Sequence, residues 1–263
     1  MARDFSRVKR VVVKVGTSSL TTKDSRLDPR KVRKVVAEVM DLRREGKEVL
    51  LVTSGAIGAG VGRMGMKGRP EELSLLQAAA AVGQGILMRV YERYFDRYGQ
   101  PIAQLLLTKE DFTHPERSKN LKNTLRVLLQ WGVVPVVNEN DSVAVEEIKF
   151  GDNDLLSAHL AVLARADLLI LLSDVDGLYT GDPKREKGVR LVREVREFTP
   201  ELERMGGMGA GGFGGMKTKI QAAKMACSRG IPVVVARAGE RRVLKRLLKG
   251  EEIGTLFLPG GGK

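Results

Sequence analysis

Apolar runs of strand length alternate along this chain with segments whose apolar residues recur at helical spacing. Residues 8–15 form the first apolar run. Asp28 and Pro29 then begin a segment in which apolar residues recur every three or four positions, and Gly46 follows its end. Since Asp is favoured at the N-cap, Pro at the first helical position and Gly after the last, this pattern predicts a strand followed by a helix.

The same alternation continues to the end of the chain. Further strands are predicted at 47–53, 102–107, 133–137, 168–172, 231–236 and 254–258, and further helices at 71–98, 115–131, 154–165, 219–229 and 241–249. This order is typical of an α/β fold, with a mostly parallel open sheet sandwiched by helices. We see no internal repeat or interdomain linker and predict one domain with two lobes, the second beginning near residue 165.

Polar and glycine-rich segments follow four of the predicted strands, at 14–19, 53–60, 138–142 and 173–179. Gly, Asn, Asp and Ser also dominate ordinary turns, so one such segment alone has little meaning. In open α/β sheets, however, ligands bind beyond the carboxyl ends of the strands. Several such segments at one edge of the sheet therefore predict a binding site there.

A glycine run, Gly212-Phe213-Gly214-Gly215, leads into Met216-Lys217-Thr218-Lys219 at the start of a predicted helix. Glycines let backbone N–H groups approach an anion, a helix N-terminus adds positive dipole, and lysine adds a full charge. The segment therefore suits phosphate, although a flexible surface loop with solvated lysines has the same composition.

Two familiar nucleotide motifs do not explain these segments. A P-loop enzyme is not favoured, because Gly46-Lys47 is followed by Glu48 rather than by Ser or Thr. The spacing Gly-x-Gly-x-x-Gly occurs from Gly60 and from Gly209, but neither copy lies between a first strand and its helix, so a Rossmann dehydrogenase is not favoured.

Composition narrows the class of protein further. The chain has 263 residues, a formal net charge of +13, one cysteine and two separated histidines. These numbers exclude a disulfide framework and predict no metal cluster of Cys and His, and Cys227 fits a small core position. We see no secretory leader and no apolar run near the roughly 20 residues of a membrane span, so we expect a cytoplasmic protein. With few aromatic residues, the basic charge suits small anionic substrates better than nucleic acid.

Six segments together resemble the amino acid kinase family. They are Val13-Lys14-Val15-Gly16-Thr17-Ser18, Val52-Thr53-Ser54-Gly55-Ala56-Ile57, Asn138-Glu139-Asn140-Asp141, Phe150-Gly151-Asp152-Asn153-Asp154, Leu172-Ser173-Asp174-Val175-Asp176-Gly177-Leu178-Tyr179 and Gly214-Gly215-Met216-x-Thr218-Lys219. They occur in family order across essentially the whole chain, and the second and fourth together point to the members that act on glutamate. The resemblance implies ATP-dependent phosphorylation of the side-chain carboxylate of L-glutamate to L-glutamyl 5-phosphate, the first step of proline biosynthesis.

The resemblance also implies roles for single residues. Lys14 and Lys219 would approach the transferring phosphoryl group, and Asp154 would orient them. Backbone N–H groups of Gly16 and Gly55 would face the same phosphate. Four residues match positions that hold glutamate, with the carboxylate of Asp141 receiving the ammonium group; they are Ser54, Gly55, Asp141 and Asn153. The matching nucleotide positions are Lys14, Gly16, Ser173, Asp174, Phe213, Gly214, Gly215, Met216, Lys217, Thr218 and Lys219.

Further expectations follow from the family. About 1–164 would form the amino-acid-binding lobe and about 165–263 the nucleotide-binding lobe, without the C-terminal RNA-binding-like module of many relatives. Mg²⁺ would bridge the ATP phosphates without a dedicated protein cage. Phe213 and Lys217 depart from the small polar residues common in relatives. Homo-oligomerisation, feedback by proline near 142–151, and transfer of the product to the next enzyme of the pathway are also expected.

Two other functions remain open at this point. A family member acting on acetylglutamate or aspartate would have the same fold, but Asp141 suits a free ammonium better than an acetylated nitrogen. A non-catalytic nucleotide sensor or RNA-binding protein is the other alternative, which the joint presence of Lys14, Asp154 and Lys219 disfavours.

Overall fold

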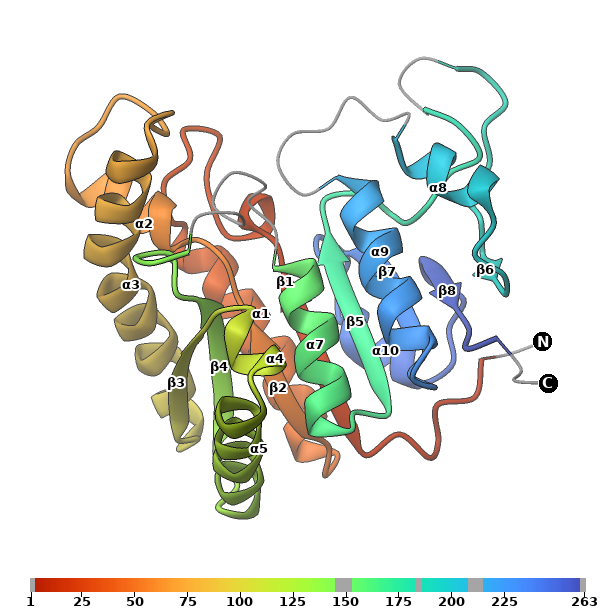
Figure 1. The fold of residues 1–263 in the computed structure, drawn as a ribbon, viewed down its shortest axis with the longest axis horizontal. Helices are drawn as coiled ribbons and strands as arrows, with labels where there is room; N and C mark the ends of the chain where they lie inside the picture. The colour runs from red at the N-terminus through yellow and green to blue at the C-terminus, as the bar shows by residue number, and fades with distance from the viewer. Residues whose placement is uncertain (1–2, 145–152, 183–185, 208–214, 261–263) are drawn as a thin grey trace.

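An eight-stranded sheet forms the centre of the computed structural model, which describes residues 3–144, 153–182, 186–207 and 215–260. The strands are β1 (Arg10–Val15), β2 (Glu48–Val52), β3 (Ile102–Leu107), β4 (Val134–Glu139), β5 (Leu168–Ser173), β6 (Glu194–Val195), β7 (Val233–Arg237) and β8 (Thr255–Phe257). Their order is β3-β4-β2-β1-β5-β7-β8-β6, and Figure 1 shows this sheet running across the molecule. The pairs are parallel except for β7 with β8. The predicted α/β class with a mostly parallel sheet is confirmed.

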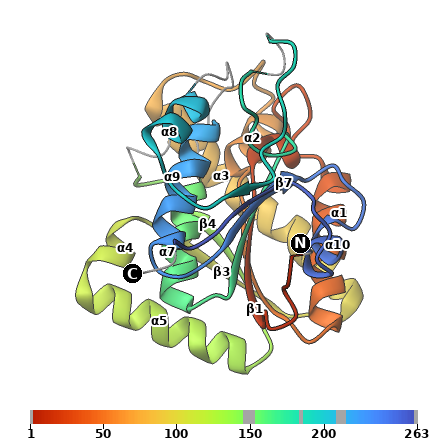
Figure 2. The same ribbon diagram turned by 90° about the vertical axis from the view of Figure 1, so that its right-hand side faces the viewer.

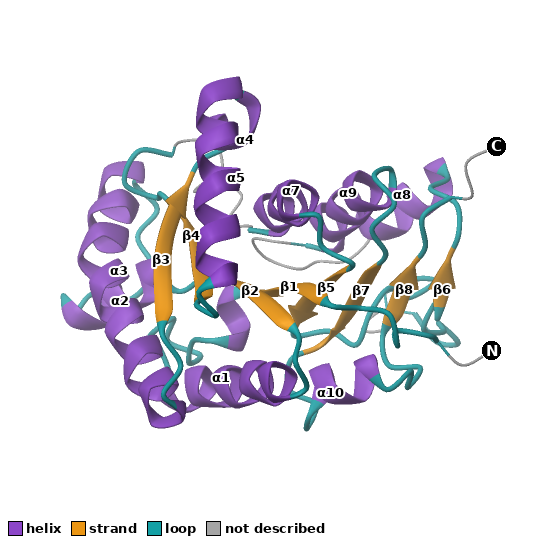
Figure 3. Cartoon of the chain, turned by 90° about the horizontal axis from the view of Figure 1, so that it is seen from below, coloured by secondary structure: helices purple, strands orange, loops and turns teal. Residues whose placement is uncertain are grey.

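Helices cover both faces of this sheet. They are α1 (Pro29–Arg44), α2 (Ala56–Arg63), α3 (Leu73–Phe95), α4 (Glu110–Thr113), α5 (Pro115–Gln130), α7 (Asp154–Ala164), α8 (Pro200–Gly207), α9 (Met216–Cys227) and α10 (Val243–Leu248), with short 3-10 turns η1 (Thr17–Ser19) and η2 (Asp96–Tyr98). Figures 2 and 3 show α1 and α10 on one side, and α5, α7 and α9 on the other. Each layer buries its own apolar cluster against the sheet.

The predicted start and stop signals of the first helix are confirmed. The side chain of Asp28 accepts a hydrogen bond of 2.9 Å from the Arg30 N–H, and Pro29 begins the helix. Gly46 follows the helix with a φ of 77°, a conformation that glycine adopts without strain. The helix therefore begins and ends where the local chemistry places it.

Strand β1 determines which way the first candidate lysine points. Val11 and Val13 belong to the cluster beneath α1, whereas Val12 belongs to the cluster beneath α7 and α9. Since side chains alternate along a strand, Lys14 lies on the same face as Val12. The strand lies between β2 and β5, where the chain changes its direction of winding, and ligand-binding crevices form at such switch points.

Helix α2 was not predicted from the sequence, which gave only a glycine-rich segment after the strand at 47–53. A Cβ at Gly60 would lie 1.8 Å from the Ala79 carbonyl oxygen, and one at Gly83 would lie 1.8 Å from the Ala56 carbonyl oxygen. These glycines therefore allow α2 and α3 to pack backbone against backbone. This packing accounts for Gly60, the first glycine of the Gly-x-Gly-x-x-Gly spacing, whereas Gly65, the last one, follows the end of α2 with a φ of 65°.

Smaller differences concern elements with weak local signals. The pattern did not predict the single-turn helix α4, and it placed no element in the polar stretch where β6 and α8 begin. Helix α9 begins at Met216, three residues before its expected start. Cys227 is 4% exposed, and burial raises the pKa of its thiol to about 12, as expected for a core position.

The expectation that no segment is long and apolar enough to cross a membrane is wrong for α3. Among the described residues, the span Leu73–Tyr98 is long and apolar enough by length and composition alone, with a mean hydropathy of 1.3 over an 18-residue window. The four consecutive alanines at 78–81 contribute to this value without forming a bulky apolar run. The helix packs on α2 and α1, and it contributes Leu87, Tyr91 and Phe95 to a buried cluster of the domain.

Candidate active site

Two lysines and one aspartate meet in a buried cluster at the carboxyl end of β1. The Nζ atom of Lys14 lies 2.5 Å from Oδ1 of Asp154, and that of Lys219 lies 3.0 Å from Oδ2 of the same carboxylate. The exposed fractions are 2% for Lys14, 0% for Asp154 and 5% for Lys219. The structure therefore brings together the three residues that the sequence predicted to be catalytic.

Three elements position this cluster. Lys14 comes from β1, Asp154 is the first residue of α7, and Lys219 lies in the first turn of α9. A carboxylate at a helix N-terminus is stabilised by the helix dipole. The Thr218 hydroxyl also donates to Oδ2 of Asp154, at 3.2 Å. Close packing of α7 against α9 keeps the two helix starts adjacent.

Within the described part of the chain, the carboxylate of Asp154 is shared by two ammonium groups, those of Lys14 and Lys219. Burying a charge is costly unless it is paired, and attraction between opposite charges is stronger away from water. Two buried ammonium groups at the carboxyl edge of the sheet are suited to an anionic ligand. Since both oxygens of Asp154 face ammonium groups, this carboxylate is suited to orienting the lysines rather than to accepting a proton.

A second group of predicted residues lies next to this cluster. The amide nitrogen Nδ2 of Asn153 lies 3.1 Å from the Ser54 hydroxyl oxygen and 2.6 Å from the Thr53 carbonyl oxygen. Asn153 directly precedes Asp154, so the group is joined to the charged cluster by one peptide bond. The structure thus places two of the predicted glutamate ligands, Ser54 and Asn153, in contact with each other.

The two glycines predicted to face the phosphate differ in conformation. Gly55 caps α2 with a φ of 106°, where any side chain would be strained. Gly16 has an ordinary φ of −77°, and its N–H donates to the Leu172 carbonyl over 3.4 Å. The requirement for glycine is therefore conformational at position 55, whereas at position 16 the N–H has a long bond that a phosphate oxygen could replace.

Asp141 lies beyond β4 at the same edge of the sheet. Burial raises the pKa of its carboxyl to about 6, and the nearby Arg69 guanidinium opposes the rise. Burial likewise lowers the pKa of Arg69. An acid with this pKa is mostly ionised at neutral pH and can bind an ammonium group. The arginine was not predicted from the sequence, because it lies in a loop without a recognised motif.

The predicted nucleotide positions are described only in part. Ser173 ends β5 and its hydroxyl donates to the exposed Asp174 over 3.2 Å. Gly215 caps α9, where Met216 begins the helix and Lys217 is exposed. Phe213 and Gly214 lie outside the described residues. The same holds for most of 142–151, the segment expected to contribute to proline binding.

Two buried residues of this region, Gln84 and Tyr91, were missed by the sequence predictions. Asn138 accepts from Asn153 over 2.9 Å and donates to Gln84 over 2.9 Å, and the Tyr91 hydroxyl lies 2.8 Å from that of Thr53. A polar residue within an apolar helical pattern, such as Gln84, is the one signal that could have marked the contact. Its partner depends on how α3 packs on β4.

Metal ligation has no preformed site in the described part of the chain. No group of three or more His, Cys, Asp or Glu side chains lies together there. The carboxylate of Asp154, the acid at the centre of the charged cluster, is already engaged by two lysines. This donor set fits a cation that arrives with phosphate oxygens and water.

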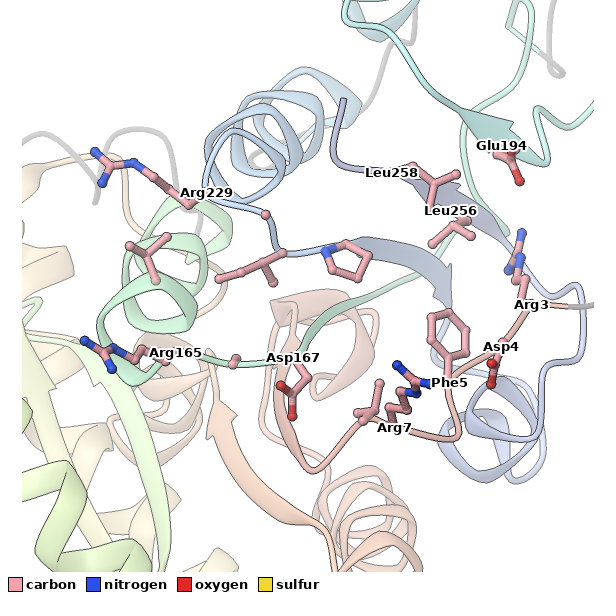
Figure 4. Close-up of a pocket in the computed structure, with 16 residues that line it drawn as sticks. Arg3, Asp4, Phe5, Arg7, Arg165, Asp167, Glu194, Arg229, Leu256 and Leu258 are labelled. Carbon is pink, nitrogen blue, oxygen red and sulfur yellow. The ribbon is translucent and has the colours of Figure 1, made fainter. Parts of the chain in front are cut away.

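A cavity of about 600 Å³ lies at the opposite edge of the sheet. Figure 4 shows Arg165 and Arg229 on one side of it, and Phe5 and Arg7 near the start of the chain on the other. Its lining comes from segments that precede β1, β5 and β7, together with residues of β8. No predicted site residue lines this cavity. The cavity and the buried charged cluster therefore indicate two different positions for an active site, and the paired lysines and carboxylate favour the cluster.

Comparison with known proteins shows to which family a chain with this site belongs. The sequence model of the amino acid kinase family matches residues 9–237. The chain belongs to the amino acid kinase family. Among relatives of this family, a glutamate 5-kinase of Carboxydothermus hydrogenoformans is 52% identical over 262 residues, which cover 98% of this chain and 70% of that protein. A glutamate 5-kinase of Symbiobacterium thermophilum is 51% identical over 259 residues, 98% of each chain.

A solved structure supports the fold assignment of this amino acid kinase family member. Carbamate kinase from Giardia lamblia, bound to AMP-PNP, superimposes with a TM-score of 0.69 over 96% of this chain and 99% of that one. The sequence identity is 18%, so this similarity concerns the fold alone.

Proposed function

We propose that this chain is a glutamate 5-kinase, which transfers the γ-phosphoryl group of ATP to the side-chain carboxylate of L-glutamate. The observation that carries phosphoryl transfer is the buried cluster of Lys14, Asp154 and Lys219. The choice of glutamate is supported by about half-identical relatives named glutamate 5-kinase, one of which is matched along 98% of both chains. The product, L-glutamyl 5-phosphate, is the first intermediate of proline biosynthesis.

The proposed mechanism needs no general base. A glutamate side chain has an ordinary pKa near 4.3, so its carboxylate is already a nucleophile at neutral pH. The remaining requirements are in-line positioning and positive charge around the transferring phosphoryl group. Lys14 and Lys219 supply that charge, and Asp154 holds both ammonium groups in one place. Mg²⁺ held by the ATP phosphates would neutralise further negative charge on the phosphate oxygens.

Binding of glutamate is assigned to the neighbouring group. The Asp141 carboxylate would receive the ammonium group, while Ser54 and Asn153 offer a hydroxyl and an amide at the same edge. Gly55 would let the backbone approach the reacting carboxylate. ATP would lie beyond β5 and the start of α9, where Ser173, Asp174 and residues 215–219 occur.

Other expectations stay part of this proposal. The lobe division near residue 165, a homo-oligomeric assembly, feedback by proline and a cytoplasmic location are supported by the family membership. Transfer of the acyl phosphate to the next enzyme is supported by the lability expected of such a mixed anhydride.

The test is ADP formation by the purified protein with Mg-ATP and a panel of glutamate, acetylglutamate, aspartate and UMP. Hydroxylamine traps an acyl phosphate as its hydroxamate. Glutamate-dependent ADP release with a hydroxamate product is the expected result. Activity with another acceptor alone would keep the fold and contradict the substrate, whereas activity with none would contradict a kinase.

A further inference from the structure

A chain of buried amide side chains runs from helix α3 to the proposed glutamate site. Gln84 comes from α3, Asn138 from β4, and Asn153 from the start of α7. The Asn138 amide nitrogen lies 2.9 Å from Gln84 Oε1, and that of Asn153 lies 2.9 Å from Asn138 Oδ1. Their exposed fractions are 9%, 2% and 6%. Three separate elements are therefore joined by two hydrogen bonds away from water.

The direction of this chain is determined by its hydrogen bonds. A side-chain amide has a donating nitrogen and an accepting oxygen, so fixing one end fixes the other. The nitrogen of Asn153 lies 2.6 Å from the Thr53 carbonyl oxygen, 2.9 Å from Asn138 Oδ1 and 3.1 Å from the Ser54 hydroxyl oxygen, and its two hydrogens serve the two shorter contacts best. The oxygen of Asn138 therefore faces Asn153, and its nitrogen must donate to Gln84. If Asn138 were rotated by half a turn, nitrogen would face nitrogen at one end and oxygen would face oxygen at the other.

This polarity determines what the site offers to a ligand. The Ser54 hydroxyl oxygen lies 3.1 Å from Asn153 Nδ2, and because this nitrogen can only donate, the Ser54 hydroxyl hydrogen points away from it and stays available for a carboxylate. The two amide hydrogens of Asn153 are directed to protein acceptors, which leaves its Oδ1 suited to an ammonium group. One donor and one acceptor in fixed places match the two charged groups of an amino acid.

We propose that Gln84 is a positioning residue for the amino-acid substrate, acting through Asn138 and Asn153 on Ser54. The inference rests on the proposed glutamate site but assigns a new role to a residue of the neighbouring helix. Gln84 Oε1 is the acceptor that holds the orientation of Asn138, whereas Gln84 Nε2 has no hydrogen-bond partner within the described part of the chain. The oxygen of this side chain, and not its nitrogen, carries the role.

Two substitutions of similar size separate this role from packing. Gln84→Met removes the acceptor but keeps an unbranched side chain of similar length. Gln84→Glu keeps an oxygen that accepts from Asn138 and replaces only the unpartnered nitrogen. We expect Gln84→Met to raise KM for glutamate roughly three- to tenfold, the range for one lost hydrogen bond, with KM for ATP unchanged. We expect Gln84→Glu to stay within about twofold of the parent, because the same bond is kept.

A double-mutant cycle tests whether the effect passes through Ser54. In a Ser54→Ala background, Gln84→Met should change KM for glutamate less than it does in the parent, since the hydroxyl it orients is gone. Additive effects would overturn the proposal, as would an unchanged KM for glutamate in Gln84→Met or equal increases of KM for both substrates. If Gln84→Met does not fold, an increased KM for glutamate in the folded Gln84→Glu variant would overturn it as well.

The parent enzyme separates this inference from the proposed function. If the parent enzyme forms no hydroxamate with glutamate, the proposed substrate is contradicted. The same KM comparison would then be made with whichever acceptor of the panel is active. Retained discrimination between Met and Glu at position 84 would support the positioning role, and its loss would overturn that role alone.

Discussion

Replacing Lys219 by Met removes one positive charge from the buried cluster while keeping most of the side-chain length. Asp154 keeps Lys14 at 2.5 Å and the Thr218 hydroxyl at 3.2 Å, so no charge is left buried without a partner. The free energy of unfolding should therefore fall by much less than the roughly 3–5 kcal/mol that accompanies an orphaned buried charge. Folding and catalysis are thus expected to separate in this variant.

The expected loss of catalysis can be calculated in two ways. Two unit charges about 4 Å apart attract by about 4 kcal/mol at an effective dielectric constant near 20. Losing one preorganised stabiliser of developing charge typically costs about 2.7–4 kcal/mol, or roughly 10²–10³ in kcat. Both values place the Lys219→Met turnover at least about a hundredfold below the parent.

The assay is kcat for ADP release with Mg-ATP and glutamate, together with a urea unfolding curve. Lys224→Met is the matched control, because Lys224 lies on the same helix in an exposed pair with Glu203, 2.7 Å apart. Exposed pairs contribute at most about 1 kcal/mol, so this control should keep parental turnover and stability. A folded Lys219→Met variant with kcat within about tenfold of the parent would refute the role assigned to this lysine.

Three further predictions follow from the same geometry. Asp154→Asn removes the carboxylate that two buried ammonium groups share. Urea titration should therefore show a loss of about 3–5 kcal/mol in the free energy of unfolding. A loss below about 1 kcal/mol would contradict the electrostatic coupling. Gly60→Ala places a Cβ 1.8 Å from the Ala79 carbonyl oxygen and should lower the free energy of unfolding by at least about 1–3 kcal/mol. Gly62→Ala is the control, because its Cβ has room, and it should be neutral or slightly stabilising. Equal melting temperatures of the two variants would disprove the close helix contact. Because burial raises the pKa of Asp141 to about 6, protonation below that pH removes the charge that binds the ammonium group, and kcat/KM for glutamate should fall about tenfold per pH unit. Asp141→Asn should lose this limb of the profile, and a parental profile that stays flat down to pH 5 would argue against the assignment.

Sequence patterns predicted most of the fold because its central strands are buried on both faces and its helices are amphipathic. The strand at 102–107 and the start of α1 at Pro29 occur as predicted, because apolar runs and capping residues act locally. Helix α2 was missed because its glycines have low helix propensity, and their close contact with α3 overrides that propensity.

The candidate site likewise has residues that the sequence predicted and contacts that only the tertiary structure established. Lys14, Asp154 and Lys219 were predicted from motifs at strand ends and helix starts, since the carboxyl ends of parallel strands meet at one edge. The connection of Gln84 to Asn138 depends on how α3 lies against β4, more than fifty residues away in the chain. A local sequence pattern cannot predict a contact between residues so far apart in the chain.

By itself, the sequence of this protein determined the alternation of strands and helices, the family and the residue types available for phosphoryl transfer. Tertiary structure alone decided that one carboxylate is shared by two lysines, that α2 is a helix and that a buried glutamine orients two asparagines. The physical reason is that propensity, capping and burial pattern act over a few residues. Charge pairing and hydrogen-bond direction are determined only when separate elements pack together.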